Sequence, residues 1–343
     1  MKILLIGGTG KISMAISKQL LMEGHELYLI NRGNRNQELD HVTDHPPIYL
    51  TGDVHNEETM KSLLSDLSFD AVADFIAFHP SDLERDYRLF CNKTRQFLFI
   101  SSASAYQKPL ANYRITESTP LSNPYWEYSR EKIEGENYLM HLYRKEQFPV
   151  TIVRPSSTYD ERSIPAGIHG AKGSFSTIKR ILSNKPVIIH GDGTSLWTIT
   201  HNSDFARGFI GLLGNIHAIG ETVHITSDET VTWDQIYSII ADALGCPDFK
   251  RVHISSEFLA ACGKQYDFAG ALLGDKANSV VFDNRKLKQL VPGFTATKRA
   301  DQGIRESIQY ILSHPECQIE DPAFDMWCDK VIAAREKALR SLV

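Results

Sequence analysis

The 343-residue sequence lacks the features that mark several classes of protein. Its five cysteines are scattered and form no CxxC pair, which is typical of reduced thiols in the cytoplasm rather than of a disulfide framework. No apolar run approaches the roughly 20 residues that span a bilayer, and the N-terminal apolar stretch is too short for a secretory signal. The net charge of -5 gives no support to a nucleic-acid partner. The 13 histidines form no ligand cluster, so no metal site is expected.

Hydrophobic residues make up 42% of the chain and charged residues 23%, as in soluble globular proteins. In the first half, short apolar runs alternate with amphipathic stretches. The pattern predicts strands at residues 3–6, 27–30, 48–50, 71–76, 97–100 and 150–153, and helices at 11–23, 57–67, 81–91 and about 124–146. Continuous apolar strands alternating with helices imply a parallel sheet covered on both faces, a Rossmann-like doubly wound α/β layer. Ligands are then expected at the carboxyl ends of its strands.

After about Arg162 this rhythm loosens. Residues 187–200 predict two strands around a Gly-Asp-Gly turn, and residues 231–245 predict a helix with Thr232 as N-cap and Gly245 as its stop. We therefore expect a dinucleotide-binding domain at 1–162 and about 197–230. A smaller, mixed α/β substrate-binding region is expected at 163–196 and about 231–343.

The stretch GGTGKIS, residues 7–13, directly follows the first predicted strand and precedes the first predicted helix. This is the context that a dinucleotide-binding glycine turn requires. Gly7 would allow the tight turn, and Gly10 would let the backbone approach a pyrophosphate at the helix N-terminus. Ser13 stands where the last glycine is usual and adds only a hydroxymethyl group. A nucleotide site is predicted, with a purely structural turn as the alternative.

The end of the second predicted strand bears on which dinucleotide is held. NAD sites usually carry Asp or Glu there to bind the adenosine ribose. This chain has Asn31 followed by Arg32, with Arg35 close by and Lys11 in the glycine turn. A guanidinium pairs with a 2′-phosphate that a carboxylate would repel, so NADP(H) is favoured over NAD(H). The alternative is that Arg32 faces solvent and Asn31 binds the ribose.

Two further loops follow predicted strands. Asp53 is placed to accept a hydrogen bond from an adenine amino group, although an Asx-turn or N-cap role is also open. Phe78 and His79, after the fourth strand, would line a nicotinamide pocket or pack within their loop.

Tyr128 and Lys132, in the stretch YSREK, are i,i+4 neighbours on a predicted helix and share one face. A nearby ammonium would lower the pKa of the tyrosine and let it act as an acid or base near neutrality. With 13 tyrosines in the chain, such a pair also arises by chance. Its position is more informative, because it follows the strand of FLFISSASAY, which places Ser101, Ser102 and Ser104 at the mouth of the sheet.

Together with GDV at Asp53, IVRPSSTY and HGDGTSLWTITHNSDFA, these motifs resemble the extended short-chain dehydrogenase/reductase family of NAD(P)-dependent sugar epimerases and dehydratases. The resemblance covers most of the chain and implies a homodimer. It implies that Tyr128 is the catalytic acid/base, that Lys132 lowers its pKa and holds the nicotinamide ribose, and that Ser102 hydrogen-bonds the reacting oxygen. The implied cofactor-binding residues are Gly7, Thr9, Gly10, Lys11, Ile12, Asn31, Arg32, Arg35, Asp53, Val54, Ile76, Ala77, Phe78, Ser101, Tyr128, Lys132, Pro155 and Ser157. The implied substrate-binding residues are His79, Ser104, Tyr159 and Arg162.

Several positions depart from the family pattern. Ser157 replaces an asparagine that often contacts nucleotide-sugar phosphates, and HNSDFA replaces the usual HVDDVA. A sugar or nucleotide-sugar substrate is therefore implied by the family more than by these residues. A net NADPH-dependent reductase of a small carbonyl compound is an alternative. The NRG after the second strand resembles a branch that includes a chloroplast stem-loop RNA-binding group, so a non-catalytic binding or regulatory protein also stays open.

Overall fold

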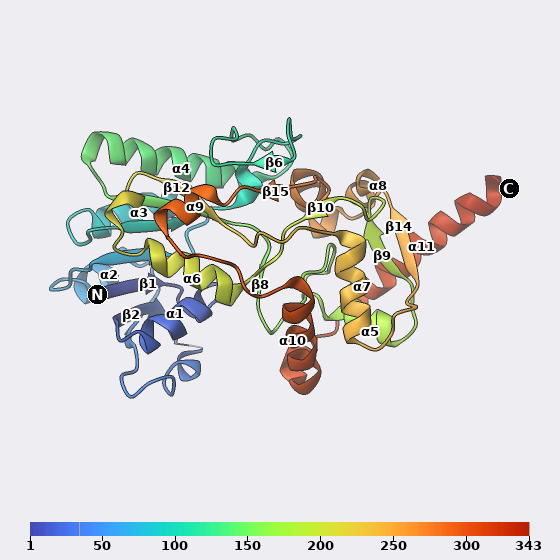
Figure 1. Ribbon diagram of the computed structural model, residues 1–343, viewed down its shortest axis with the longest axis horizontal. Coiled ribbons are helices and arrows are strands. Elements are labelled where there is room, and N and C mark those ends of the chain that lie inside the picture. Colours follow the sequence, from blue (N-terminus) through green and yellow to red (C-terminus); the bar gives the residue numbers. More distant parts are fainter. Residues whose placement is uncertain (34, 343) are drawn as a thin grey trace.

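The computed structural model describes residues 1–33 and 35–342, and its centre is a seven-stranded parallel sheet (Figure 1). The strand order is β12-β7-β5-β4-β1-β2-β3. The order reverses between β1 and β4, and such a switch point is where doubly wound sheets bind ligands. The predicted fold class is confirmed. The strands are β1 (Lys2–Ile6), β2 (Glu26–Asn31), β3 (Ile48–Thr51), β4 (Ala71–Asp74), β5 (Phe97–Ile100), β7 (Val150–Pro155) and β12 (Thr222–Ile225).

Helices cover both faces of the sheet because its strands are apolar on both sides. Successive residues alternate between two cores: Ile3 and Leu5 of β1 face one, and Leu4 and Ile6 face the other. The first core is closed by α1 (Ser13–Met22) and α6 (Asn202–Leu212). The second is closed by α2 (Glu57–Leu63), α3 (Pro80–Phe90) and α4 (Glu127–Glu146). Figure 1 shows α3 and α4 on the side of the sheet opposite α1 and α6.

The second region packs around Trp197 and Trp233, whose stacked rings lie 5.4 Å apart. In Figure 1 it lies to the right of the sheet, and the end of α11 projects from it. Its larger elements are α5 (Phe175–Leu182), β9 (Val187–His190), α7 (Trp233–Ala243), β14 (Arg251–Ile254), α8 (Ser256–Cys262), the π-helix η5 (Ala269–Lys276), α10 (Ala300–Ser313) and α11 (Pro322–Leu342).

Short elements connect the two regions and complete the chain. The strands among them are β6 (Arg114–Ile115), β8 (Thr158–Tyr159), β10 (Leu196–Trp197), β11 (Thr200–His201), β13 (Val231–Thr232) and β15 (Val281–Phe282). The helices among them are η1 (Asn36–Glu38), η2 (Ala103–Ala105), η3 (Ile216–Ala218), η4 (Lys264–Tyr266), α9 (Arg285–Leu290) and η6 (Pro315–Cys317). None of the helices described is long and apolar enough to cross a membrane.

Three local predictions needed correction or refinement. The helix expected from Pro124 begins at Glu127, because the Asn123 side chain accepts hydrogen bonds from the N–H groups of Tyr125 and Trp126 and forms a turn there. The helix expected to reach residue 67 ends at Leu63. The two strands predicted around the Gly-Asp-Gly turn exist but do not pair with each other, since β9 pairs with β14 and β10 with β13. The α7 prediction is confirmed, including the Thr232 cap, which accepts from the N–H of Gln235.

Candidate active site

The glycine turn between β1 and α1 is held by side-chain hydroxyls. Gly7 has a φ of +80°, and a Cβ there would lie 2.6 Å from Cγ2 of Ile76, so only glycine fits. The Ser13 hydroxyl donates to the Gly7 carbonyl at 2.6 Å and accepts from the Gly10 N–H at 2.9 Å. Ser17, which the motif did not single out, donates to the Gly8 carbonyl at 2.6 Å. The Ser13 side chain therefore stabilises the turn through two hydrogen bonds, in addition to its packing.

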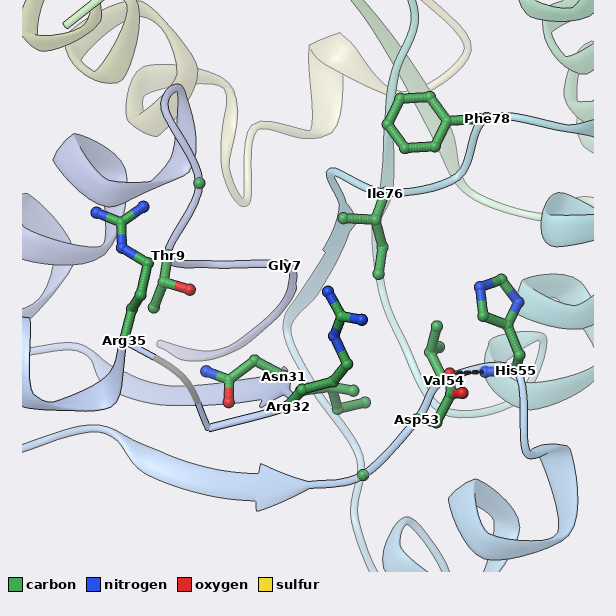
Figure 2. Close-up of a pocket in the computed structure, with 13 residues that line it drawn as sticks. Gly7, Thr9, Asn31, Arg32, Arg35, Asp53, Val54, His55, Ile76 and Phe78 are labelled. Atoms are coloured by element: carbon green, nitrogen blue, oxygen red, sulfur yellow. Dashed lines mark hydrogen bonds between the residues drawn. The ribbon is translucent and has the colours of Figure 1, made fainter. Parts of the chain in front are cut away.

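A cavity of about 530 Å³ opens beside this turn, at the carboxyl ends of the strands on both sides of the switch point (Figure 2). Its lining combines loops that follow β1, β2, β3 and β4, as expected for a dinucleotide site. Of the predicted cofactor residues it brings together Gly7, Thr9, Gly10, Asn31, Arg32, Arg35, Asp53, Val54, Ile76 and Phe78. Ile30, Gly52 and His55 also line the cavity; they were not predicted, although they are direct neighbours of predicted residues.

The end of the cavity at the loop after β2 is rich in hydrogen-bond donors. The Asn31 Oδ1 atom accepts from the Gly33 N–H at 2.8 Å, which fixes the orientation of the amide. Its Nδ2 atom is buried and has no hydrogen-bond partner among the described residues. Arg32 is exposed and lines the same cavity, and its guanidinium points toward the other lining residues in Figure 2, so both of its interpretations stay open. Arg35 lines the same cavity, and its Nε and Nη2 atoms bind Glu38 at 2.6 and 2.9 Å.

Asp53 keeps both of its open interpretations. Its Oδ1 atom accepts from the His55 N–H at 3.0 Å, which is an Asx turn, and the residue also lines the cavity (Figure 2). The N-cap of α2 is Asn56 instead, whose side chain accepts from the N–H of Thr59.

Ser102 and Tyr128 are the two candidate proton-handling groups. Ser102 follows β5, and its Oγ atom lies 2.8 Å from that of Ser104. Tyr128 lies in the first turn of α4, half-buried beside Trp126. Burial raises the pKa of Tyr128, and its polar contact with the Ser102 hydroxyl opposes that rise. The phenol is therefore protonated at neutral pH in this structure.

Lys132 was expected to lower the pKa of Tyr128, but burial is the largest influence on that pKa here and raises it. Its Nζ atom donates to the carbonyls of Ala77 at 2.7 Å and Ile100 at 2.9 Å. It lies 5.6 Å from the centre of the Tyr128 ring. Burial lowers the pKa of Lys132 to about 8, so the ammonium still keeps its proton at neutral pH. Loss of hydration, rather than a neighbouring charge, dominates the titration of both groups.

Two of the three predicted serines lie behind the site. Ser101 is buried and donates to Glu136 at 2.5 Å, and Glu136 forms a buried ion pair with Arg154, so the Ser101 side chain is structural. Ser104 is also buried and accepts from Ser129 at 2.7 Å, so it supports Ser102 rather than facing a substrate. Consecutive residues leaving a strand point to opposite faces, and this separates Ser101 from Ser102.

The other predicted residues occupy several different places. Tyr159 is a core residue, 3% exposed, packed against Gly303 of α10. Arg162 pairs with Asp160 and lines a second cavity that it shares with Arg35.

His79 is exposed, and its Nδ1 atom lies 2.7 Å from a Glu131 carboxylate oxygen. Ala77 contributes its carbonyl to Lys132. Four more residues lie outside the lining of the first cavity: Lys11 and Ile12, in the glycine turn, and Pro155 and Ser157, at the end of β7.

Asn123 is a site residue that the sequence analysis missed. Its Nδ2 atom donates to the Ser104 carbonyl at 2.8 Å and to the Gly274 carbonyl at 2.7 Å, which joins the serine loop to η5. The Asn-Pro dipeptide at 123–124 was its only sequence signal, since it favours a turn. Nowhere in the described part of the chain do three or more His, Cys, Asp or Glu side chains gather as a metal site would require.

Comparisons with known proteins agree with this geometry. A protein of known structure, the UDP-glucuronic acid 4-epimerase of Bacillus cereus in complex with UDP-glucuronic acid and NAD, superposes with a TM-score of 0.71 at 21% identity over 91% of this chain and 99% of its own. Chloroplast stem-loop binding protein of 41 kDa b from Arabidopsis thaliana is 27% identical over 78% of this chain and 68% of its own. An uncharacterized UDP-glucose epimerase, YtcB, of Bacillus subtilis (strain 168) is 31% identical over 63% of this chain and 60% of its own.

The family model that matches describes the NAD dependent epimerase/dehydratase family, and it aligns to residues 3–92 and 87–226. These ranges contain the glycine turn, the cavity lining, the serine loop and the Tyr128–Lys132 helix. The chain therefore belongs to the NAD-dependent epimerase/dehydratase family, as its motifs predicted.

Proposed function

We propose that this protein is an NADP(H)-preferring enzyme that interconverts a hydroxyl and a carbonyl group on a sugar or nucleotide-sugar. The observation that carries the proposal is that Ser102, which follows β5, and Tyr128, in the first turn of α4, lie close together at the mouth of the sheet whose glycine turn opens the 530 Å³ cavity. On this proposal the sheet region holds the dinucleotide and the second region holds the substrate. Five free thiols support a reducing compartment such as the cytoplasm, and the homodimer expected from the family is testable by light scattering.

The residues of the cavity fit a dinucleotide. Gly7 leaves open the space that a Cβ would fill against Ile76. The Nδ2 atom of Asn31 can only donate, and it is buried without a partner among the described residues, so it suits an acceptor. Arg32 adds a guanidinium directed into the same space (Figure 2). A 2′-phosphate offers only acceptor oxygens, whereas a ribose hydroxyl is best bound by a carboxylate. Since the family is NAD-dependent, the preference for NADP(H) belongs to this chain's own residues.

When bound, the dinucleotide supplies or accepts a hydride. With its pKa raised, Tyr128 is protonated at neutral pH and is ready to give its proton to a substrate carbonyl oxygen. Ser102 would donate a hydrogen bond to the same oxygen while negative charge develops on it. In the reverse direction Tyr128 takes the hydroxyl proton back. Lys132 would hold the nicotinamide ribose, and its two carbonyl contacts fix where its Nζ lies.

The surroundings of Ser102 favour epimerisation or reduction over dehydration. Among the described residues, the hydrogen-bond partners of the Ser102 and Ser104 side chains are hydroxyls and one backbone N–H. Elimination of water needs an acid and a base at two different carbons, and neutral hydroxyls supply neither efficiently at neutral pH. A hydride transfer coupled to one proton transfer needs only Tyr128.

The test is a Tyr128→Phe variant, with Tyr125→Phe as the matched control because Tyr125 is an exposed tyrosine in the turn just before the same helix. Turnover with NADPH or NADH would be followed on a panel of UDP-sugars and free keto-sugars. Tyr128→Phe is expected to reduce kcat at least about 100-fold and to leave the dinucleotide Kd unchanged, since a general acid contributes about 10²–10⁴-fold. Equal turnover by both variants would refute the proposed mechanism.

One relative supports a second candidate. The Arabidopsis relative is named as a stem-loop binding protein, so this chain would bind RNA if that property were shared. RNA binding that weakens steeply with salt, without turnover of any panel sugar, would favour this candidate. The net charge of -5 counts against it.

A further inference from the structure

The Arg35 side chain lies between two neighbouring cavities and lines both of them. It lines the 530 Å³ cofactor cavity, where Figure 2 shows it near Thr9, and also a neighbouring cavity of about 710 Å³. The second cavity is formed by η1, the loop that follows Arg162, and residues of α10 and η6. A single side chain thus connects the ribose end of the cofactor site to the second region.

Arg35 is already bound by a carboxylate. Its Nε and Nη2 atoms lie 2.6 and 2.9 Å from the two oxygens of Glu38, a forked pair that uses one edge of the guanidinium. A forked pairing of that same edge with a 2′-phosphate would require the ion pair between Arg35 and Glu38 to break. The side chains of Arg35 and Glu38 are 31% and 38% exposed, so their pair is weak enough to exchange.

A second cation lies within reach of Glu38. The Glu38 Oε2 atom is 3.9 Å from Nη1 of Arg162. Arg162 itself is held by Asp160, whose Oδ2 atom accepts from Nε and Nη2 at 2.9 and 2.8 Å. The Nη1 atom of Arg162 is thus the one that faces Glu38, and it can take over this carboxylate when Arg35 turns away.

We propose that Glu38 determines the choice between NADP(H) and NAD(H) by an ion-pair exchange: it holds Arg35 when the 2′ position is a hydroxyl and moves to Arg162 when a 2′-phosphate takes Arg35. This inference rests on the proposed cofactor site. Arg162 is then a positioning residue for the cofactor rather than a substrate contact. Asn31 and Arg32 supply the donors that stay in place, and Glu38 sets how much Arg35 adds to them.

The test measures Kd for NADPH and for NADH with the purified full chain, by fluorescence titration at low salt. Glu38→Gln is expected to lower the Kd for NADPH about two- to fivefold and to leave the Kd for NADH unchanged, as for loss of one exposed ion pair. Arg162→Gln is expected to raise the Kd for NADPH about twofold, because Glu38 then stays paired with Arg35. The same substitution should have no effect in the Glu38→Gln background. Glu316→Gln is the control, since Glu316 lines the same second cavity and carries the same charge.

Three results would overturn the exchange: equal effects of Glu38→Gln on the two dinucleotides, an equal gain from Glu316→Gln, or an Arg162→Gln effect that persists without Glu38. The proposed cofactor preference fails separately, if the wild type binds NADH more tightly than NADPH. The exchange is judged on the change in the ratio of the two Kd values between variants. An Arg35→Gln variant should abolish the Glu38→Gln gain in NADPH binding.

Discussion

Replacing Ser13 by glycine would restore the usual glycine of the turn, and it should nevertheless destabilise this protein. Ser13 is 1% exposed, and its hydroxyl makes two hydrogen bonds within the turn, to the Gly7 carbonyl and from the Gly10 N–H. Each neutral hydrogen bond contributes about 0.5–1.5 kcal/mol net, so the substitution should lower the free energy of unfolding by about 1–3 kcal/mol. The loss should appear as a lower urea midpoint.

Cofactor binding should respond differently from stability. In Ser13→Gly the Gly10 N–H loses its partner and becomes available to a pyrophosphate oxygen at the helix N-terminus. We therefore expect the NADPH Kd to change by less than about twofold, far less than 1–3 kcal/mol would give if the turn collapsed. Ser81→Ala, an exposed serine in the first turn of α3, is the control for stability. If Ser13→Gly matched or exceeded the wild type in urea, the hydroxyl would not fasten the turn.

Two further substitutions test the turn and the second region. Gly7→Ala should lower the free energy of unfolding by about 1–3 kcal/mol and weaken NADPH binding, because the added Cβ meets Ile76. Gly24→Ala, at a φ of +76° with open space around it, should lower stability without weakening NADPH binding. An equal loss of NADPH binding in both variants would contradict this. Burial lowers the pKa of His190 to about 4, so the unfolded chain binds more protons below pH 6.5 and stability falls as pH drops from about 6.5 to 4, by on the order of 3 kcal/mol. His190→Gln should flatten that fall in urea midpoints measured against pH, whereas exposed His217→Gln should not, and an unchanged slope in His190→Gln would refute the assignment.

Local sequence was sufficient where function depends on neighbouring residues. The glycine turn and Asn31–Arg32 each follow a strand directly, and the carboxyl end of a parallel strand fixes where the next few residues lie. For the same reason the sequence predicts most of the cavity lining. The residues missed there, such as Gly52 and His55, adjoin predicted ones.

The predicted roles of residues were less accurate where those roles depend on contacts with residues far away in the sequence. Tyr159 stands in a family motif, yet it is buried by Gly303, 144 residues later, and joins the core. Lys132 shares a face of α4 with Tyr128, but its Nζ atom also donates to the carbonyls of Ala77 and Ile100, and the spacing could not predict these contacts. Spacing of i,i+4 puts two side chains on one face but does not say what else comes to that face.

Asn123 shows why the second region matters to the two proton-handling residues, Ser102 and Tyr128, although both lie in the first region. Its Oδ1 atom accepts from the N–H groups of Tyr125 and Trp126, at the start of the helix that carries Tyr128. Its Nδ2 atom donates to the carbonyls of Ser104 and Gly274. Because every donor and acceptor of this amide is used, it can serve all of these partners only in one arrangement. The Ser102 loop and the Tyr128 helix are therefore aligned through η5 of the second region, and a substrate that shifts η5 would shift both proton-handling groups together.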